Sequence, residues 1–326
     1  MAEVNWPKVV LVIGAGSIGE RHIGIVRAAW PDTKIVVLRS RNLPLRSIEA
    51  DWVTIETEWE AAMTHMPAVA IICTPTAQHA AEATRCLAAG LDVLVEKPIA
   101  HNLAGKEELT SMLAASGRYL QIAYMLRYHP FMQQISRLIA SEKYGQLVSS
   151  TTYWGEYLPD WHPWEDYRES YAAKKELGGG AALTLSHDLD LVMWLNGALQ
   201  SSSISKSYSK TLAVDIDVEA IADVQLTFEN GSIASCHLSF ADRFPRRHYR
   251  FVFDEAAIDI NYFEERMEIH TQSGTETRTM NGWHRNDMFA AQWAYFCTAR
   301  QANGAKNTTQ AALKLAYDIT HICTQS

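Results

Sequence analysis

A glycine-rich turn near the N-terminus limits the possible folds of this chain more than any other feature. The apolar run at residues 8–13 leads directly into GAGSIG at residues 14–19, and an amphipathic stretch covers residues 17–29. A G-x-G-x-x-G turn between a strand and a helix lets a pyrophosphate approach the backbone at the positive end of the helix. We therefore expect a dinucleotide here; the alternative is a tight turn without a ligand.

The first third of the chain alternates short β-branched runs with longer Ala-rich amphipathic stretches. This rhythm is typical of parallel strands joined by crossover helices, and it predicts a Rossmann domain at residues 1–124, an α/β fold with a doubly wound parallel sheet. The expected strands are residues 8–13, 34–38, 52–55, 68–72, 92–95 and 119–123, and the expected helices include residues 17–29 and 77–89.

After Arg127 the rhythm changes. A helix is expected near residues 130–141 and another opening near Gly180, with strands at residues 146–153, 219–228, 232–240, 248–253, 257–261 and 267–271 and closing helices at residues 286–300 and 308–324. Asn230-Gly231 is typical of a tight hairpin. We predict an α+β domain at residues 125–326 for substrate binding and oligomerisation. Its large open, mostly antiparallel sheet would have one free face that pairs with a second copy in a homodimer or homotetramer.

Composition narrows the partners and the location. The 326 residues carry a formal net charge of −8, and no basic run with interleaved aromatics indicates nucleic-acid binding. Five cysteines without a CxxC pair favour reduced thiols. We expect no signal peptide, because the first apolar run is cut short by Gly14, and no apolar stretch reaches the ~20 residues that a membrane span needs. We expect a cytoplasmic protein without membrane contact, and no metal, because histidines and cysteines lack ligand spacing.

The end of the second expected strand indicates the coenzyme. An NAD-preferring site places a carboxylate there, but the sequence reads Arg39, Ser40 and Arg41. Guanidinium groups beside a hydroxyl can grip a 2′-phosphate. NADP is therefore the preferred coenzyme, and NAD stays possible because surface arginines are common in loops.

Two further segments make the prediction specific. TPTAQH at residues 74–79 and EKP at residues 96–98 resemble the TPxxxH and EKP signatures of the glucose-fructose oxidoreductase / inositol dehydrogenase / MocA (Gfo/Idh/MocA) family. The likeness continues through LRYHP at residues 126–130, GGG at 178–180, HDLDLVMW at 187–194 and RNDMF at 285–289, so it covers nearly the whole chain. Within the family, the chain is similar to the surface-polysaccharide biosynthesis branch.

The resemblance implies a nicotinamide near Lys97 and a substrate hydroxyl held between Lys97 and His187, the two expected catalytic residues. The expected coenzyme-binding residues are Gly14, Gly16, Ser17, Ile18, Gly19, Arg39, Ser40, Arg41, Thr74, Pro75, His79, Glu96, Lys97 and Arg127. Two positions depart from the family pattern. Leu183 stands where an acidic residue is usual, with Thr184 as the nearest polar side chain, and Met125 replaces a frequent asparagine.

This residue set suits hydride transfer. Oxidation of a carbinol needs a base for the hydroxyl proton and a positive group beside the developing alkoxide, and either His187 or Lys97 can take the proton. An aromatic loop at residues 153–168 suits a sugar, unless its tryptophans merely pack on one another. The expected substrate residues are Tyr153, Trp161, Trp164, Arg168, Thr184 and Asp190.

Three functions remain open at this point. The first is an NAD(P)-dependent dehydrogenase or reductase that acts on CH–OH groups of a sugar, cyclitol or nucleotide sugar. The second is a non-catalytic dinucleotide-binding regulatory protein, since a fold does not fix a function. The third is a redox-neutral enzyme that keeps its coenzyme through a hidden oxidation.

Overall fold

The computed structural model describes residues 6–40, 45, 52–208, 214–302 and 305–325. The chain divides into two compact units. The first comprises Met1–Met125 and His284–Tyr317, and the second comprises Leu126–Trp283 and Asp318–Ser326.

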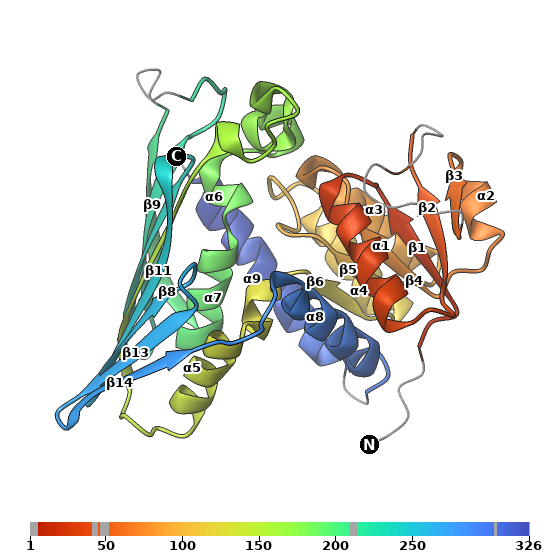
Figure 1. Cartoon of the computed structure of the whole chain (residues 1–326). Coiled ribbons are helices and arrows are strands. Elements are labelled where there is room, and N and C mark those ends of the chain that lie inside the picture. Colours follow the sequence, from red (N-terminus) through yellow and green to blue (C-terminus); the bar gives the residue numbers. More distant parts are fainter. Residues whose placement is uncertain (1–5, 41–44, 46–51, 209–213, 303–304, 326) are drawn as a thin grey trace. The chain divides into compact units, whose positions relative to one another are not determined.

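The first unit is built on a six-stranded parallel sheet in the order β3-β2-β1-β4-β5-β6 (Figure 1). Its strands are β1 (Val9–Ile13), β2 (Lys34–Leu38), β3 (Val53–Glu56), β4 (Val69–Ile72), β5 (Asp92–Val95) and β6 (Leu120–Ile122), and its crossover helices are α1 (Ser17–Ala29), α2 (Trp59–Met63), α3 (Thr76–Ala88) and α4 (Lys106–Ser116). The order reverses between β1 and β4, and ligands of such sheets bind in the crevice at this point. The expected Rossmann fold is confirmed.

The first unit also contains α8 (Arg285–Ala299) and most of α9 (Ala305–Thr324). Trp293 is buried against Trp30 with ring centroids 5.9 Å apart, and Phe296 lies 5.5 Å from Tyr119. Arg300 Nε donates to the Asp92 carboxylate over 2.8 Å. Residues 284–317 therefore complete the first unit, because the apolar side of α8 packs on α1 and beside β6. The sequence pattern predicts these residues in the second domain.

The second unit holds an eight-stranded sheet in the order β14-β13-β12-β11-β7-β10-β9-β8. Its strands are β7 (Leu147–Tyr157), β8 (Leu199–Ser207), β9 (Ile221–Phe228), β10 (Ile233–Ser239), β11 (Ala241–Phe253), β12 (Ala256–Asn261), β13 (Arg266–Thr271) and β14 (Gly274–Thr279). All neighbours pair antiparallel except β7 and β10. The mostly antiparallel sheet is as expected, but β8, β14 and the first half of β11 were missed.

Helices α5 (Pro130–Ala140), α6 (Ala181–Thr184) and α7 (His187–Asn196) lie on one side of this sheet (Figure 1). On β7, Ser150, Thr152 and Trp154 are buried on that side, whereas Thr151 and Tyr153 face the other way. Five short 3-10 turns of the described residues lie between these elements: η1 (Met125–Tyr128) before α5, and η2 (Leu158–Asp160), η3 (Tyr167–Glu169), η4 (Tyr171–Ala173) and η5 (Lys175–Leu177) between β7 and α6. Because α5, α6 and α7 all cover the same side, none of these three helices covers the other face of the sheet (Figure 1).

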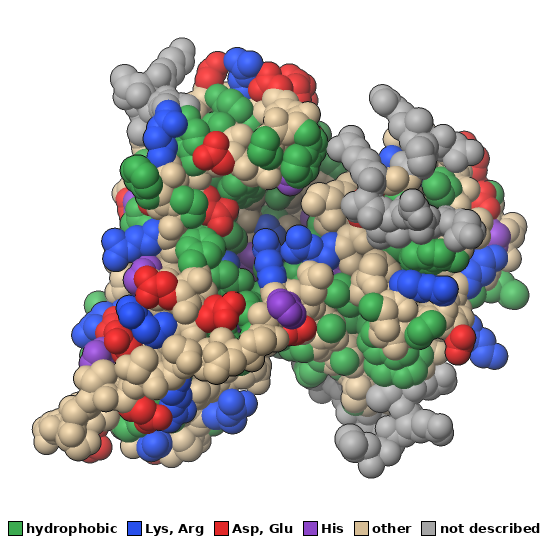
Figure 2. Space-filling view, viewed as in Figure 1, with side chains coloured by type: hydrophobic (Ala, Val, Ile, Leu, Met, Phe, Trp, Pro, Cys, Tyr) green, Lys and Arg blue, Asp and Glu red, His purple; other side chains and the backbone are tan. Residues whose placement is uncertain are grey.

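The distribution of charged side chains on the surface agrees with the modest net charge of the chain (Figure 2). On the face drawn in Figure 2, acidic and basic side chains are interspersed over the second unit, without a continuous basic stripe. Within the part of the chain that the structure describes, no helix is both long enough and apolar enough to cross a bilayer.

Candidate active site

The glycine-rich turn joins β1 to α1, and its three glycines have different surroundings. Gly14 has a φ of 87°, and a Cβ there would lie 2.8 Å from the Cys73 carbonyl oxygen. A Cβ at Gly19 would lie 2.3 Å from the Gly14 carbonyl oxygen. Close backbone packing therefore requires these two glycines.

Gly16 is different, because a Cβ there would meet no atom of the described residues within 4 Å, its two chain neighbours apart. Gly16 is also the N-cap of α1, and none of the described side chains caps this helix, whereas His129 caps α5. The space above Gly16 and the uncapped N-terminus form a cradle that fits a pyrophosphate, since such ends offer N–H donors and a positive dipole.

The other expected coenzyme residues of this unit lie at the carboxyl ends of neighbouring strands. Arg39 is half-buried and Ser40 is exposed after β2, while Arg41 lies outside the described residues. Thr74 and Pro75 follow β4, and the Thr74 hydroxyl is buried without a hydrogen-bond partner among the described residues. Thr74 thus offers a polar group at the strand ends where a ligand is expected.

His79 is 2% exposed, and both of its ring nitrogens contact backbone carbonyl groups. Its Nδ1 lies 2.7 Å from the Pro98 carbonyl oxygen and its Nε2 lies 2.7 Å from the Thr74 carbonyl oxygen. Burial lowers the pKa of His79, an effect that these carbonyls only partly oppose. His79 thus connects the loops after β4 and β5 through both of its ring nitrogens.

Glu96 is likewise held inside the unit. Its Oε1 lies 2.8 Å from Nε2 of His22 on α1, and its Oε2 accepts from the Lys97 backbone N–H over 3.2 Å. Burial raises the pKa of the Glu96 carboxyl, but the hydrogen bond and charge of His22 and the charge of Lys97 outweigh it, so the pKa lies below its ordinary value. Glu96 thus ties the loop that carries half-buried Lys97 to α1.

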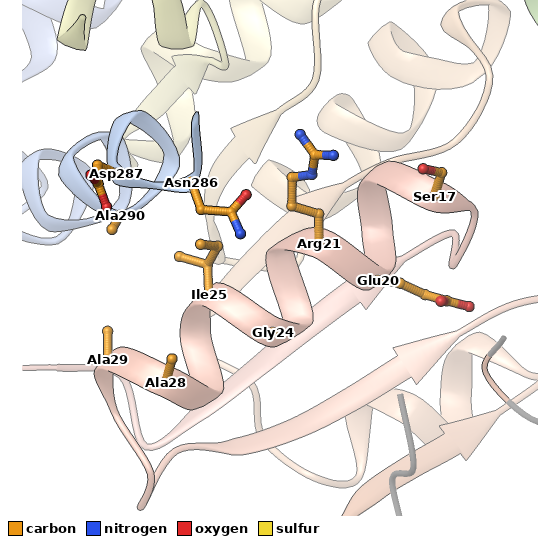
Figure 3. Close-up of a pocket in the computed structure, with 10 residues that line it drawn as sticks. All are labelled: Ser17, Glu20, Arg21, Gly24, Ile25, Ala28, Ala29, Asn286, Asp287 and Ala290. Atoms are coloured by element: carbon orange, nitrogen blue, oxygen red, sulfur yellow. The ribbon is translucent and has the colours of Figure 1, made fainter. Parts of the chain in front are cut away.

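A groove of about 710 Å³ runs between α1 and α8. Figure 3 shows Arg21, Ile25 and Asn286 between the two helices, while Glu20 points away from α8. The guanidinium of Arg21 lies 5.2 Å from the ring centroid of Phe289. Of the expected coenzyme residues only Ser17 lines this groove, so it is separate from most of that set.

In the second unit, His187 is the first residue of α7 and is 4% exposed. Its imidazole stacks on Trp154 of β7, with centroids 6.1 Å apart and an angle of 30° between the planes. Thr184 ends α6 and is buried one helical turn before His187. His187 and Thr184 therefore lie together on the helical side of the sheet.

Arg127 and Asp190 form a two-pronged ion pair. Arg127 Nε donates to Asp190 Oδ2 over 2.8 Å and Nη2 donates to Oδ1 over 2.5 Å. The carboxylate is 1% exposed, and its burial raises its pKa more than Arg127 lowers it. This pairing argues against the expected substrate contact of Asp190 and indicates that it orients Arg127, a quarter of which is exposed.

The structure adds residues that the sequence motifs did not indicate. Arg247 of β11 is 3% exposed and donates from Nη2 to Asp188 Oδ1 over 2.6 Å. Glu219 is 7% exposed and accepts from the Ala182 N–H over 3.0 Å, so it lies beside α6, the short helix that precedes His187 in the chain. Burial raises the pKa of Glu219. At the departure from the family pattern, Leu183 is buried and supplies no acid.

The aromatic side chains of residues 153–168 differ in their surroundings. Trp161 packs on Phe240 with centroids 5.4 Å apart, Trp164 is 70% exposed, and exposed Arg168 pairs with Asp166. Tyr153 donates from its hydroxyl to Asp242 on the face of the sheet opposite Trp154. Because side chains alternate along a strand, this placement argues against a substrate role for Tyr153 within its own subunit.

Comparison with known proteins gives matches over most of the chain. Residues 8–124 match the GFO_IDH_MocA model, an oxidoreductase family with an NAD-binding Rossmann fold, and residues 132–275 match the GFO/IDH/MocA C-terminal domain. A 4-carboxy-2-hydroxymuconate-6-semialdehyde dehydrogenase from a Sphingobium species is 25% identical over 255 residues, 75% of this chain and 76% of that protein. Three further curated relatives match over 30% to 64% of their own length.

Solved structures share the fold over the whole length. A levoglucosan dehydrogenase in complex with NADH has a TM-score of 0.78 at 17% identity, covering 97% of this chain and 96% of that one. The UDP-N-acetylglucosamine 3-dehydrogenase of Acidithiobacillus ferrooxidans has a TM-score of 0.74 at 19% identity, covering 96% and 97%.

Proposed function

Because this chain belongs to the Gfo/Idh/MocA oxidoreductase family, we propose that it transfers hydride between a nicotinamide dinucleotide and a carbinol or carbonyl of a sugar, cyclitol or nucleotide sugar. The observation that carries the proposal is the cradle at Gly16, where the backbone is open and α1 is uncapped. A bound nicotinamide supplies the acceptor or donor of the hydride.

The chain's own residues divide the remaining work. In oxidation, the His187 imidazole takes the proton of the substrate hydroxyl, and the Lys97 ammonium stabilises the negative charge that develops on that oxygen. In reduction the imidazole returns the proton. Lys97 lies in the first unit and His187 in the second, so their convergence on one substrate oxygen is part of the proposal.

Replacement of these two residues tests the division of work. Lys97→Met and His187→Gln should each lower kcat at least about a hundredfold, within the range that general acid–base groups contribute. His187→Gln should leave coenzyme affinity nearly unchanged, whereas Lys97→Met should also weaken coenzyme binding, because Lys97 is one of the expected coenzyme-binding residues. Lys8→Met, at an exposed position of the same unit as Lys97, is the matched control and should keep the wild-type kcat. Full activity in either active-site variant would refute the assignment.

The coenzyme proposal is NADP in preference to NAD. It is supported by Arg39 and Ser40 after β2, where no carboxylate of the described residues stands. Arg39→Ala should raise KM for NADP about tenfold or more and change KM for NAD little, because a charge-assisted bond to a 2′-phosphate is lost. A wild-type enzyme that prefers NAD would overturn this part of the proposal.

The substrate class rests on the aromatic loop and on the relatives. Trp161 and exposed Trp164 offer flat faces for sugar rings, and a UDP-N-acetylglucosamine 3-dehydrogenase is among the similar structures. A panel of free sugars, cyclitols and nucleotide sugars, followed through the nicotinamide absorbance, tests it. Mass spectrometry of small molecules that copurify with the native protein identifies a trapped coenzyme or sugar.

One observation favours a second candidate function. Buried Leu183 occupies the position of the family's usual acid, which suits a regulator that binds the dinucleotide without turnover. A regulator would bind coenzyme and never oxidise or reduce it with any member of the panel. Lys97→Met would then leave its biological effect intact.

We also propose that a second copy of the chain covers the open face of the eight-stranded sheet. The strands there expose an alternating polar and apolar surface, including Ile233, which is 55% exposed. Analytical ultracentrifugation should give a dimer or tetramer, and Ile233→Glu should weaken it. A monomer at micromolar concentration would contradict the proposal.

A further inference from the structure

A buried cation lies close to the proposed base of the second unit. Arg247 projects from β11 to the helical side of the sheet, where its Nη2 donates to Asp188 Oδ1. The Tyr249 hydroxyl donates to the same oxygen over 3.2 Å. The Arg247 side chain is 3% exposed and the Asp188 side chain is fully buried, so the pair is removed from solvent.

One indole ring contacts both the cation and the base. The guanidinium carbon of Arg247 lies 3.6 Å from the ring centroid of Trp154, and the imidazole of His187 stacks on the same indole at 6.1 Å. The rings of Tyr262 and Tyr249 also lie near the guanidinium, at 4.9 Å and 5.7 Å. Arg247 and His187 are therefore within about 10 Å of each other and share a rigid aromatic neighbour.

Stability alone does not account for this arrangement. Replacing a buried ion pair by apolar residues of similar size is often neutral or stabilising, because burying two charges is costly. Here the pair stands beside His187, and Asp188 is its neighbour in the first turn of α7. A planar guanidinium held by a carboxylate also restricts the tilt of the ring on which it stacks.

We propose that Arg247 is a positioning residue for the reaction, which acts on His187 through Trp154 and is itself held by Asp188. The inference rests on the proposed function of His187 as the base. Asp188 fixes the guanidinium, the guanidinium fixes the indole, and the indole fixes the plane of the imidazole. The Asp188 carboxylate and the Arg247 cation oppose each other in their effect on the charge of that imidazole.

An NMR titration tests the coupling without turnover. With ¹³C-labelled histidine, the His187 signal is the one that disappears in His187→Gln. In Arg247→Met the pKa of His187 should rise by about one unit, because a cation within about 10 Å is lost and Asp188 is left unpaired. Besides Asp188, the ionisable groups around Arg247 are Tyr249, Tyr262 and His129.

Arg137→Met is the matched control, because it removes the same charge from an exposed position of the same unit. The pKa of His187 should then stay within about 0.3 unit of the wild-type value, as expected for a screened surface charge. Arg247→Lys keeps the cation and should keep the pKa within about half a unit. A pKa in Arg247→Met equal to that of the control would overturn the proposal.

Kinetics separate positioning from general packing. Arg247→Lys should lower kcat about tenfold and leave the substrate KM within about twofold, since an ammonium cannot stack flat on the indole. Trp154→Phe should keep at least about ten times more activity than Trp154→Leu, because only the former retains a stacking ring. These three variants carry the test if Arg247→Met does not fold, and equal activity of the two Trp154 variants would refute it.

The two levels of the proposal fail separately. A wild-type protein that shows no turnover with any substrate refutes the proposed function, while the titration still measures the coupling of Arg247 to His187. Turnover with an unshifted titration and full activity in Arg247→Lys refutes the positioning role alone.

Discussion

Three of the four glycines of α1 and its turn, Gly16, Gly19 and Gly24, allow one methyl group to be placed at positions with different consequences. At Gly19 the new Cβ would lie 2.3 Å from a backbone oxygen, so Gly19→Ala should lower the free energy of unfolding by about 3 kcal/mol. At Gly16 the methyl group meets no atom of the part of the chain that the structure describes, and φ is −80°, so Gly16→Ala should cost less than about 1 kcal/mol, the usual loss at an N-cap. Gly24 lies within α1 in open space, where alanine should add about 0.5–1 kcal/mol of stability.

The same series separates folding from coenzyme binding. In Gly16→Ala the methyl group takes the space into which we place the pyrophosphate, and we expect the Kd for the coenzyme to rise about 10- to 100-fold, equivalent to about 1.4–2.8 kcal/mol. Gly24→Ala should bind as the wild type does. Fluorescence titration with NADPH and NADH gives the Kd values, and thermal melting gives the stabilities. An unchanged Kd in well-folded Gly16→Ala would refute the placement of the pyrophosphate at this turn.

Three further predictions concern buried polar groups, all measured by urea unfolding. His129 Nδ1 accepts from a backbone N–H at the start of α5, and burial lowers the pKa of His129 to about 3. The unfolded chain therefore binds a proton near pH 6.5 that the folded chain does not bind, so this residue should lower the free energy of unfolding by about 2 kcal/mol between pH 7 and pH 5. His129→Gln should lack that part of the loss. Glu96→Gln loses a charged bond to His22 and should cost about 2–3 kcal/mol at neutral pH; because the folded pKa of Glu96 is depressed, the difference from wild type should shrink as pH falls below 4.5. Asp190→Asn leaves Arg127 without its carboxylate and should cost about 3 kcal/mol, whereas a loss under about 0.5 kcal/mol would indicate an ordinary surface pair.

The Rossmann unit was predictable because its local signals agree with its tertiary structure. Strands β2 and β5 and helix α1 have the expected bounds, since β-branched runs and a glycine turn mark them clearly. The strands of the second sheet were harder to predict from the sequence. Strand β8 is rich in serine, and β14 begins with a glycine and otherwise holds threonines and charged residues, so both resemble loops and become strands through their partners β9 and β13.

Pro245 explains the misplaced start of β11. A proline inside a run argues against a central strand, and the expected strand began at residue 248. The structure keeps β11 continuous but shifts its register on β7 between Ala241 and Arg246, which accommodates the proline in an irregular stretch.

Motif spacing located the candidate site but not the partners of its residues. Glu96 and His79 stand in the expected motifs, yet His22 and Pro98 occupy their polar atoms, and these contacts arise from the packing of different βα units. Arg247 stands in a run with Arg243, Arg246 and Arg250 that resembles a solvated surface. Only the alternation along β11 shows which of these arginines is buried.

The return of residues 284–317 to the first unit has a consequence for how the protein is made. On a ribosome, the parallel sheet emerges early, but α8, whose Trp293 and Phe296 pack against half-buried Trp30 and buried Tyr119, emerges only near the end of translation. The partners of Trp30 and Tyr119 on α8 are therefore absent until about nine tenths of the polypeptide has been synthesised, and exposed apolar rings favour aggregation during that interval.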